Sequence, residues 1–257
     1  IHFAHQTFNW SNEAKSNAAV HVVIIGFAQF DSTNKRIFEY ENIKSNAHEK
    51  SAKNINAYLV EGDDIVIEKR RKPLCNVLNI IKGNYYAKSE GLIIEEKDLD
   101  YLVKNEPNAK KWIKLLIGAD EFINNRKRYC LWLVDCPPDE LRKMPLVMER
   151  VNRVREDRLK STDKGMQNLA PIRFRETNNP DKCIVIPVVS SEKRPYIPIG
   201  FIDKNTISTN GNLIIPNGDL FLFGQLTSLM HMAWVKYTCG RLKSDYRYSK
   251  DLVYNNY

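Results

Sequence analysis

Residues 18–27 read Ala18-Ala19-Val20-His21-Val22-Val23-Ile24-Ile25-Gly26-Phe27, an almost continuous apolar run. Apolar side chains that do not alternate with polar ones are typical of a strand buried on both faces of a layered α/β sheet. Ile1–Phe8 is a second extended run, and the polar residues 9–17 between the two runs predict a turn. The sequence therefore predicts an N-terminal β-hairpin. We expect its apolar face to be exposed, because the chain supplies too few neighbouring strands.

The composition is that of a folded globular protein. Of the 257 residues, 43% are hydrophobic and 27% are charged, which excludes disorder as the main state. The longest apolar run is shorter than the ~18 residues that a membrane span needs, so no membrane association is predicted. Lys and Arg number 39 against 31 Asp and Glu, for a formal net charge of +8. This surplus favours a polyanionic partner such as nucleic acid, with an ordinary basic surface as the alternative.

The cysteines indicate the cellular compartment of the protein, and the first residues indicate whether the chain is a fragment. The five cysteines are scattered without a Cys-x-x-Cys pair, so neither a disulfide framework nor a zinc site is predicted. Free thiols predict a reducing, cytoplasmic environment. The chain begins at Ile1 without a signal-peptide pattern, and we expect it to be an excised fragment. Residues 31–56 are rich in Asn, Lys and Ser and predict a linker with one short strand at 36–40, so the expected domains are 1–30 and 31–257.

The remaining chain mixes helix and strand patterns, which predicts an α+β fold with mixed sheets and several helices. Strands are expected at 57–60, 65–68, 128–134, 183–189, 196–202, near Thr206 and at 213–215. Helices are expected at 97–105, 108–117 and from Pro145 to about Lys160, and a last helix capped by Asn217 or Asp219 and ending at Gly240. His231 in that last helix is predicted to be a hydrogen-bonded structural histidine.

The usual reaction centres are absent from the sequence. It contains no Gly-rich phosphate loop, no Gly-x-Ser-x-Gly elbow and no His-Glu-x-x-His motif. A carboxylate nuclease pattern can be drawn through Asp181, Glu192 and Arg194, but it is short and places Arg where such sites usually have Lys. We therefore expect this chain alone to be no enzyme and to hold no metal or cofactor, with a metal-dependent nuclease as the alternative.

Charged residues alternate with others over Arg241–Tyr248. This pattern predicts one strand with Arg241, Lys243, Asp245 and Arg247 on the same face. Lys donates to guanine O6 and N7 and Asp accepts from cytosine N4, so Lys243 and Asp245 are predicted to read both bases of one G·C pair. The alternative is a surface strand with cross-strand ion pairs.

Three further segments carry phosphate-binding side chains. The loop 190–196 combines hydroxyl, basic and aromatic groups, namely Ser190, Ser191, Lys193, Arg194 and Tyr196. Arg173 and Arg175 flank Phe174 in a similar way, with a surface strand as the alternative. The helix 145–160 has an apolar face for the core, and it also carries Arg150, Arg153, Arg155, Arg158 and Lys160. These five either form a solvated face or contact phosphate.

Several long stretches resemble the MmeI-like, type IIL restriction-modification enzymes. Residues 3–14 and 18–27 are similar to the last hairpin of that family's methyltransferase domain. The segments similar to its target recognition domain follow in the same order, at 128–133, 190–201, 223–224, 228–234, 240–242, 247–249 and 254–256.

The resemblance implies a module for sequence-specific recognition of double-stranded DNA. It implies a parent chain with an upstream methyltransferase domain that modifies adenine N6 with S-adenosylmethionine, an upstream nuclease, and a downstream helical domain. Lys243, Asp245 and Arg247 correspond to its base-reading surface. The family's cofactor loop and Asn/Asp-Pro-Pro-Tyr motif have no counterpart, since Cys136-Pro137-Pro138-Asp139 has different flanks. A structural connector without DNA contact is a further alternative.

Overall fold

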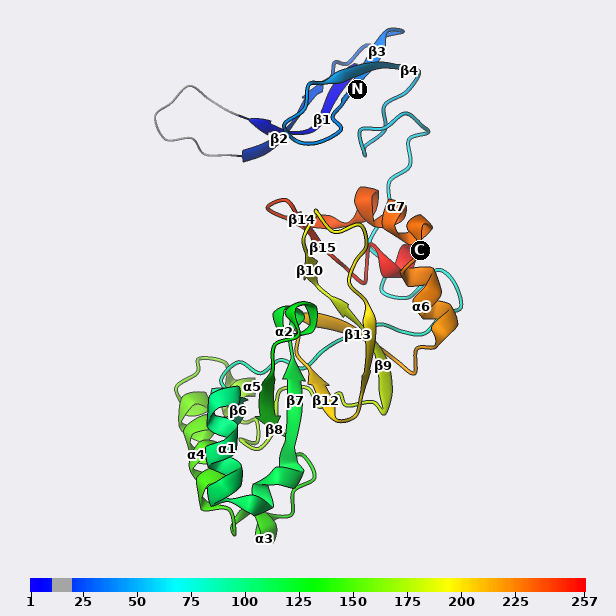
Figure 1. Cartoon of the computed structure of the whole chain (residues 1–257). Coiled ribbons are helices and arrows are strands. Elements are labelled where there is room, and N and C mark those ends of the chain that lie inside the picture. The colour runs from blue at the N-terminus through cyan, green and yellow to red at the C-terminus, as the bar shows by residue number, and fades with distance from the viewer. Residues whose placement is uncertain (11–19) are drawn as a thin grey trace. The chain divides into compact units, whose positions relative to one another are not determined.

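The computed structural model describes residues 1–10 and 20–257. The chain forms two compact units, Ile1–Lys69 and Arg70–Tyr257 (Figure 1). The helices of the described residues all lie in the second unit, and none of them is long and apolar enough to cross a membrane. The α+β class with several sheets, expected from the sequence, is confirmed.

Ile1–Lys69 contains a four-stranded sheet in the order β2-β1-β3-β4. Its strands are β1 (Phe3–Trp10), β2 (Val20–Gly26), β3 (Lys35–Glu39) and β4 (His48–Ala52). The antiparallel pairing of β1 with β2 confirms the predicted hairpin, while most of the predicted turn, at 9–17, lies outside the described residues. β3 runs parallel to β1, and β4 is antiparallel to β3.

Two expectations for this unit are wrong. The strand expected at 36–40 is present as β3, but residues 31–56 are not a linker, because β3 and the unexpected β4 pack Ile37 and Ala52 into a small core with Ala4. Short strands that bury so few apolar side chains leave little pattern in a polar segment. Residues 57–60 and 65–68 form no strand pair, and only a bridge between Ile55 and Glu61 is present there.

The expected exposure of the hairpin is confirmed. β2 is an edge strand, and its apolar side chains Val20, Val23, Ile24 and Ile25 are 37–47% exposed. The described part of the chain therefore does not bury this strand on both faces, although its composition is that of a buried strand.

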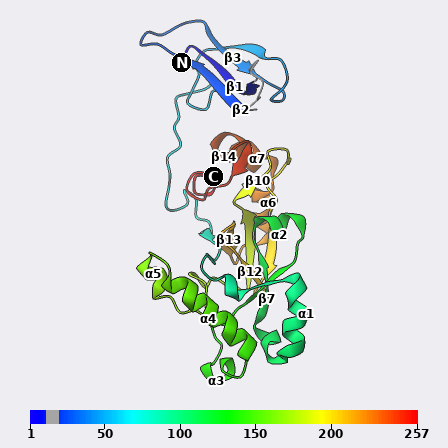
Figure 2. The same cartoon turned by 90° about the vertical axis from the view of Figure 1, so that its left-hand side faces the viewer.

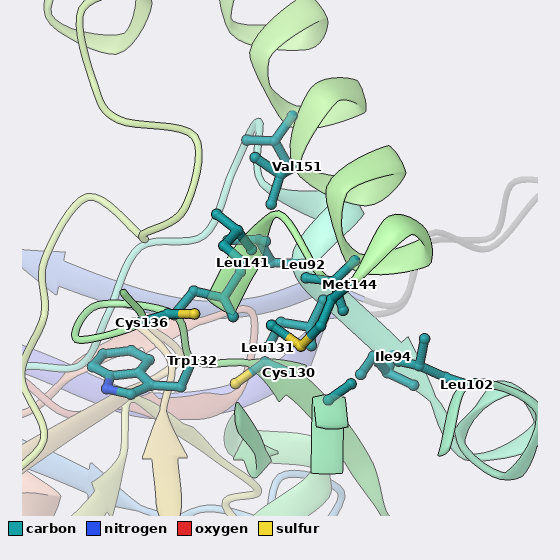
Figure 3. Close-up of a cluster of buried hydrophobic side chains, with 14 of the residues drawn as sticks. Leu92, Ile94, Leu102, Cys130, Leu131, Trp132, Cys136, Leu141, Met144 and Val151 are labelled. Carbon is teal, nitrogen blue, oxygen red and sulfur yellow. The ribbon is translucent and has the colours of Figure 1, made fainter. Parts of the chain in front are cut away.

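One sheet of Arg70–Tyr257 has the strand order β12-β7-β8-β6. Its strands are β6 (Ile93–Glu95), β7 (Ile113–Ile117), β8 (Arg128–Leu131) and β12 (Thr206–Ser208). Helical segments around it are η1 (Glu90–Leu92), α1 (Glu96–Asn105), η2 (Pro107–Trp112), α2 (Ala119–Asn124), α3 (Pro138–Leu141), α4 (Pro145–Leu159) and α5 (Lys164–Gln167). Figure 3 shows the core between this sheet and α4, where Leu92, Leu131 and Val151 meet.

The expected helix over 108–117 is wrong in its second half. The helical turn ends at Trp112, and β7 pairs in parallel with β12 and antiparallel with β8. Pairing on both sides outweighs the local helical pattern, because β7 buries Leu116 in the core.

Two more sheets complete this unit, in the orders β11-β9-β13-β5 and β10-β15-β14. Their strands are β5 (Ile81–Lys82), β9 (Lys182–Pro187), β10 (Val189–Ser190), β11 (Gly200–Asp203), β13 (Asn212–Pro216), β14 (Gly240–Leu242) and β15 (Asp245–Arg247). The expected last helix is two helices. The first, α6 (Leu220–Leu226), is capped by Asp219, and the second, α7 (Leu229–Thr238), is capped by Ser228. The short helical turn η3 (Tyr254–Asn256) comes after β15, at the end of the described chain. Within this unit, α1, α3 and α4 gather at one end and β14 and α7 at the other (Figures 1 and 2).

Candidate nucleic-acid interface

The segment Arg241–Tyr248 is a β-hairpin rather than the single strand expected from its alternation. Leu242 pairs with Asp245, Arg241 with Tyr246, and Gly240 with Arg247, so Lys243 and Ser244 form a two-residue turn. Lys243 has φ +57°, in the left-handed region that such turns require. The prediction of four charged side chains on one face of one strand is therefore wrong. A turn made of Lys and Ser lacks the Gly or Asn that usually marks a hairpin in a sequence.

The pairing decides which side chains share a face. Directly paired residues lie side by side on the same face of a sheet, and residues two apart in a strand do so too. Leu242 therefore shares a face with Asp245 and Arg247, whereas Arg241 lies on the opposite face with Tyr246. Tyr246 is buried in the core, and Leu242 and Arg247 are exposed. We call the side that carries Leu242, Asp245 and Arg247 the outer face of the hairpin.

Arg241 braces the hairpin. Its guanidinium carbon lies 3.9 Å from the centre of the Tyr246 ring, and its Nη1 donates to the carbonyl oxygen of Ser244 at 3.1 Å. The Arg241 side chain thus connects the buried Tyr246 ring on β15 to the turn that contains Lys243 and Ser244.

The loop after β10 lies beside the hairpin. β10 pairs with β15, and the backbone N–H of Glu192 donates to Asp245 Oδ1 at 3.3 Å, which orients this carboxylate. Within the loop, Ser191 Oγ accepts from the N–H of Lys193 at 3.3 Å. The side chains exposed on this loop include Lys193, Arg194 and Tyr196.

Ser190 lies beneath this surface rather than on it. The residue is 3% exposed and pairs with Tyr246 across the β10–β15 ladder. Its Oγ has no hydrogen-bond partner among the described residues. Ser191 is half-buried one residue further along, where the chain leaves the strand.

Arg173 and Arg175 are not brought together with the hairpin. The carbonyl oxygen of Arg173 accepts from Arg158 Nη2 at 2.6 Å, and Arg175 Nη1 lies 3.8 Å from Asp163 Oδ2 just before α5. Both therefore belong to the α4–α5 region, and Figure 2 shows this region at the other end of the unit from β14.

Arg158 has a role that the sequence did not reveal. Its side chain is almost fully buried and donates to the carbonyl oxygens of Lys88, Leu169, Ala170 and Arg173 and to Ser89 Oγ. Burial lowers the pKa of its guanidinium. The only sequence signal was its position, because it follows Val147, Val151 and Val154 on the buried face of α4. The predicted solvated face holds for Arg153, which is exposed and 3.7 Å from Glu149.

His231 supports the hairpin sheet from α7, as a structural histidine. Its Nε2 lies 3.0 Å from the hydroxyl of Tyr248, the residue after β15 ends. Burial lowers the pKa of His231 to about 4, so the imidazole is neutral near pH 7.

The described residues contain no group of three or more His, Cys, Asp or Glu side chains that could hold a metal ion. Asp181 Oδ1 lies 3.6 Å from Lys204 Nζ just before β9 begins, whereas Glu192 follows β10. Pro137 and Pro138 begin α3, a common position for proline at a helix start. Asp181 and Glu192 thus lie next to different strands, and the Pro-Pro pair lies at the start of a helix.

Comparisons with known proteins relate both parts of the chain to one group of enzymes. Residues 61–257 match the family described as MmeI, target recognition domain, and residues 1–39 match MmeI, DNA-methyltransferase domain. DNA methyltransferase A of Bacillus subtilis (strain 168) is 40% identical over 261 residues, which cover 100% of this chain and 29% of that protein.

The structure of the type IIL restriction-modification enzyme MmeI in complex with DNA superposes with a TM-score of 0.88 at 44% identity. It matches 99% of this chain and 34% of its own chain, so the present chain spans about a third of the length of these relatives. The match over residues 61–257 shows that the chain belongs to the MmeI target recognition domain family.

Proposed function

We propose that the chain is the module with which a DNA methyltransferase of a restriction-modification system recognises a sequence in double-stranded DNA. The observation that carries this proposal is the exposed β14–β15 hairpin, with Asp245 and Arg247 on its outer face and Lys243 at its tip. The major groove of B-DNA admits a two-stranded β-ribbon, and side chains of such ribbons reach base edges there.

In this proposal, three of the four charged residues of the hairpin read bases, namely Lys243, Asp245 and Arg247. Lys243 donates to O6 and N7 of a guanine, and Asp245 accepts from N4 of the paired cytosine. The bond from the Glu192 N–H supports this role for Asp245, because it holds the carboxylate in one orientation. Arg247, exposed on the same face as Asp245, reads a guanine or contacts the adjacent phosphate.

Backbone contacts come from the surroundings of the hairpin. Lys193, Arg194 and Tyr196 are exposed on the loop beside Asp245, and Ser191 lies at its base. Arg241 adds positive charge near the tip, and Ser190 supports the ladder from below. Arg173 and Arg175 form a separate basic site for DNA backbone further along the duplex.

The intact protein, in this proposal, modifies adenine N6 with S-adenosylmethionine in the reducing cytoplasm, and flips the target base from the duplex. Residues 1–30 belong to its catalytic domain and the chain from residue 31 onward to its recognition domain, with a helical domain downstream. The residues of this chain do not fit the cofactor, because they include no Gly-rich loop and because Pro137 and Pro138 form a helix start. The recognition step is therefore the one that this chain performs.

The test is a salt titration of DNA binding by the intact protein. We expect the logarithm of the association constant to fall linearly with the logarithm of salt concentration, because phosphate neutralisation releases counterions. Charge reversal at Lys193 and Arg194 together should reduce this slope, whereas Arg153→Gln at the α4 end serves as the matched control. Absence of DNA affinity would instead favour a structural connector, and divalent-metal-dependent cleavage by residues 1–257 alone would favour a nuclease.

A further inference from the structure

The hairpin brings an apolar residue next to the base-reading carboxylate. Leu242 and Asp245 are the pair that closes the Lys243-Ser244 turn, so their side chains lie side by side on the outer face. Leu242 is 50% exposed, although the chain has a core close by that takes up Tyr246 from the opposite face. Packing inside the protein does not account for a leucine at this position.

Spacing puts Leu242 within reach of the groove floor. Neighbouring strands lie about 4.8 Å apart, and successive bases of one DNA strand are spaced about 3.4 Å along the axis. A side chain one strand away from Asp245 on the same face therefore meets the base pair that Asp245 reads or the one next to it. Leu242 also directly precedes Lys243, so a pose that seats both Lys243 and Asp245 on one base pair brings this strand end to the same groove.

An aliphatic side chain offers no hydrogen bond, and one group on the major-groove edges is apolar, namely the C5-methyl group of thymine. We infer that Leu242 is an additional specificity-determining residue, which packs on the methyl group of a thymine next to the G·C pair read by Lys243 and Asp245. This inference rests on the proposed function. It adds one base pair to the sequence that the hairpin reads.

The experiment combines a site selection with removal of a single methyl group. The intact protein selects its sites from a pool of randomised duplexes, and each thymine of the selected site is then replaced in turn by deoxyuridine, which lacks only the C5-methyl group. At one position beside the G·C pair, the replacement should weaken binding by the wild-type protein about fourfold, the effect of withdrawing one buried methyl-sized group. The Leu242→Ala variant should bind the thymine and deoxyuridine duplexes equally well.

The matched control is Leu229→Ala, since Leu229 is an exposed leucine of α7 outside the hairpin sheet. This variant should keep the wild-type response to deoxyuridine. The inference is overturned if no thymine is selected next to the Asp245-dependent position, or if Leu242→Ala and wild type respond equally to every deoxyuridine. Failure of the proposed function gives a different result, because the protein then selects no sequence and Asp245 variants behave like wild type.

Discussion

Lys243, which we propose to read a base, has an unfavourable backbone conformation. Its φ of +57° lies in the left-handed region, which costs L-residues roughly 1–2 kcal/mol. The Arg241 bond to the Ser244 carbonyl and the closing Leu242–Asp245 pair hold the turn in place. Such strain is often found at functional sites, where the surrounding structure stabilises it.

Replacing Lys243 with Gly tests separately its effect on the stability of the fold and its effect on recognition of the G·C pair. Glycine adopts positive φ without steric cost, so we expect the free energy of unfolding to change by less than about 1 kcal/mol. Discrimination of the G·C pair should fall by about 1–3 kcal/mol, because the lysine donor is lost. Urea unfolding measures the first quantity, and competition between duplexes that differ at this pair measures the second. Lys243→Val is the contrasting variant, and it should destabilise the protein, because a β-branched residue is disfavoured at this φ.

Exchanging the donor at Lys243 and the acceptor at Asp245 should reverse the orientation of the base pair that the protein prefers. The double variant Lys243→Glu, Asp245→Arg carries an acceptor for cytosine N4 and a donor for guanine, so it should favour the flipped C·G pair. Each correct contact discriminates by ~1–3 kcal/mol, which is enough to change the sites that are modified. Sequencing of the sites modified by the intact protein checks this. An unchanged recognition sequence with full activity would remove both residues from the reading surface.

At the scale of elements, α4 shows why a basic helix cannot be assigned from its sequence alone. Arg153 and Arg158 are both arginines of one helix, yet Arg153 is exposed and Arg158 is buried with five hydrogen-bond acceptors around it. Four of these acceptors are backbone carbonyls from segments that approach α4 only in the folded chain. Arg158 thereby ties residues 88–89 to residues 169–173.

Loss of the Arg158 side chain should therefore cost stability. Arg158→Met leaves several buried acceptors unpaired, each worth about 1–3 kcal/mol, so we expect a loss of at least about 3 kcal/mol in the free energy of unfolding. Arg158→Lys should recover only part of it, because lysine offers fewer donors than arginine. Arg153→Gln is the control and should stay within about 0.5 kcal/mol. Denaturant unfolding measures all three, and a neutral Arg158→Met would show that this network is not needed.

The lowered pKa of His231 predicts that the free energy of unfolding depends on pH. Its folded-state pKa of about 4 lies below the ordinary value of 6.5, so protons bind the unfolded chain more tightly. Stability from this group is complete above pH 6.5 and decreases as the pH falls toward 4, by about 3 kcal/mol in total. We expect the difference in free energy of unfolding between wild type and His231→Gln to shrink from pH 7.5 to pH 4.5. A difference that does not vary with pH would show that His231 titrates normally.

The two compact units of the chain have different surfaces. In Ile1–Lys69 the edge strand β2 exposes Val20, Val23 and Ile25, and an apolar edge strand can pair with other chains. Arg70–Tyr257 contains the two largest cores and the candidate interface.

Removing the first unit should therefore reduce self-association. We expect residues 70–257 to remain monomeric at concentrations where residues 1–257 associate, because the apolar edge of β2 is then absent. Light scattering coupled to size-exclusion chromatography measures this. In the complete chain, Val23→Lys and Ile25→Lys together should have a similar effect. Equal association of both chains would show that the self-associating surface lies in residues 70–257.

Local sequence patterns were enough to predict much of the secondary structure. The hairpin of β1 and β2, the helix α4 with its buried valines, the cap at Asp219 and the structural role of His231 all follow from patterns within a few residues. Local periodicity and capping suffice for these features, because the interactions that form them are close in sequence. The resemblance to the MmeI-like family, carried by ordered motifs, was likewise sequence information.

Which charged residues share a surface became evident from the folded chain alone. The fold makes Arg241–Tyr248 a hairpin, with Arg241 on the face opposite Asp245 and Leu242 beside Asp245, and it places Arg173 next to Arg158 of α4 instead. It also placed β7 where a helix was expected and buried Arg158. The physical reason is the same in each case. Strand register and burial depend on partners far away in the chain, and no pattern within one segment reports on them.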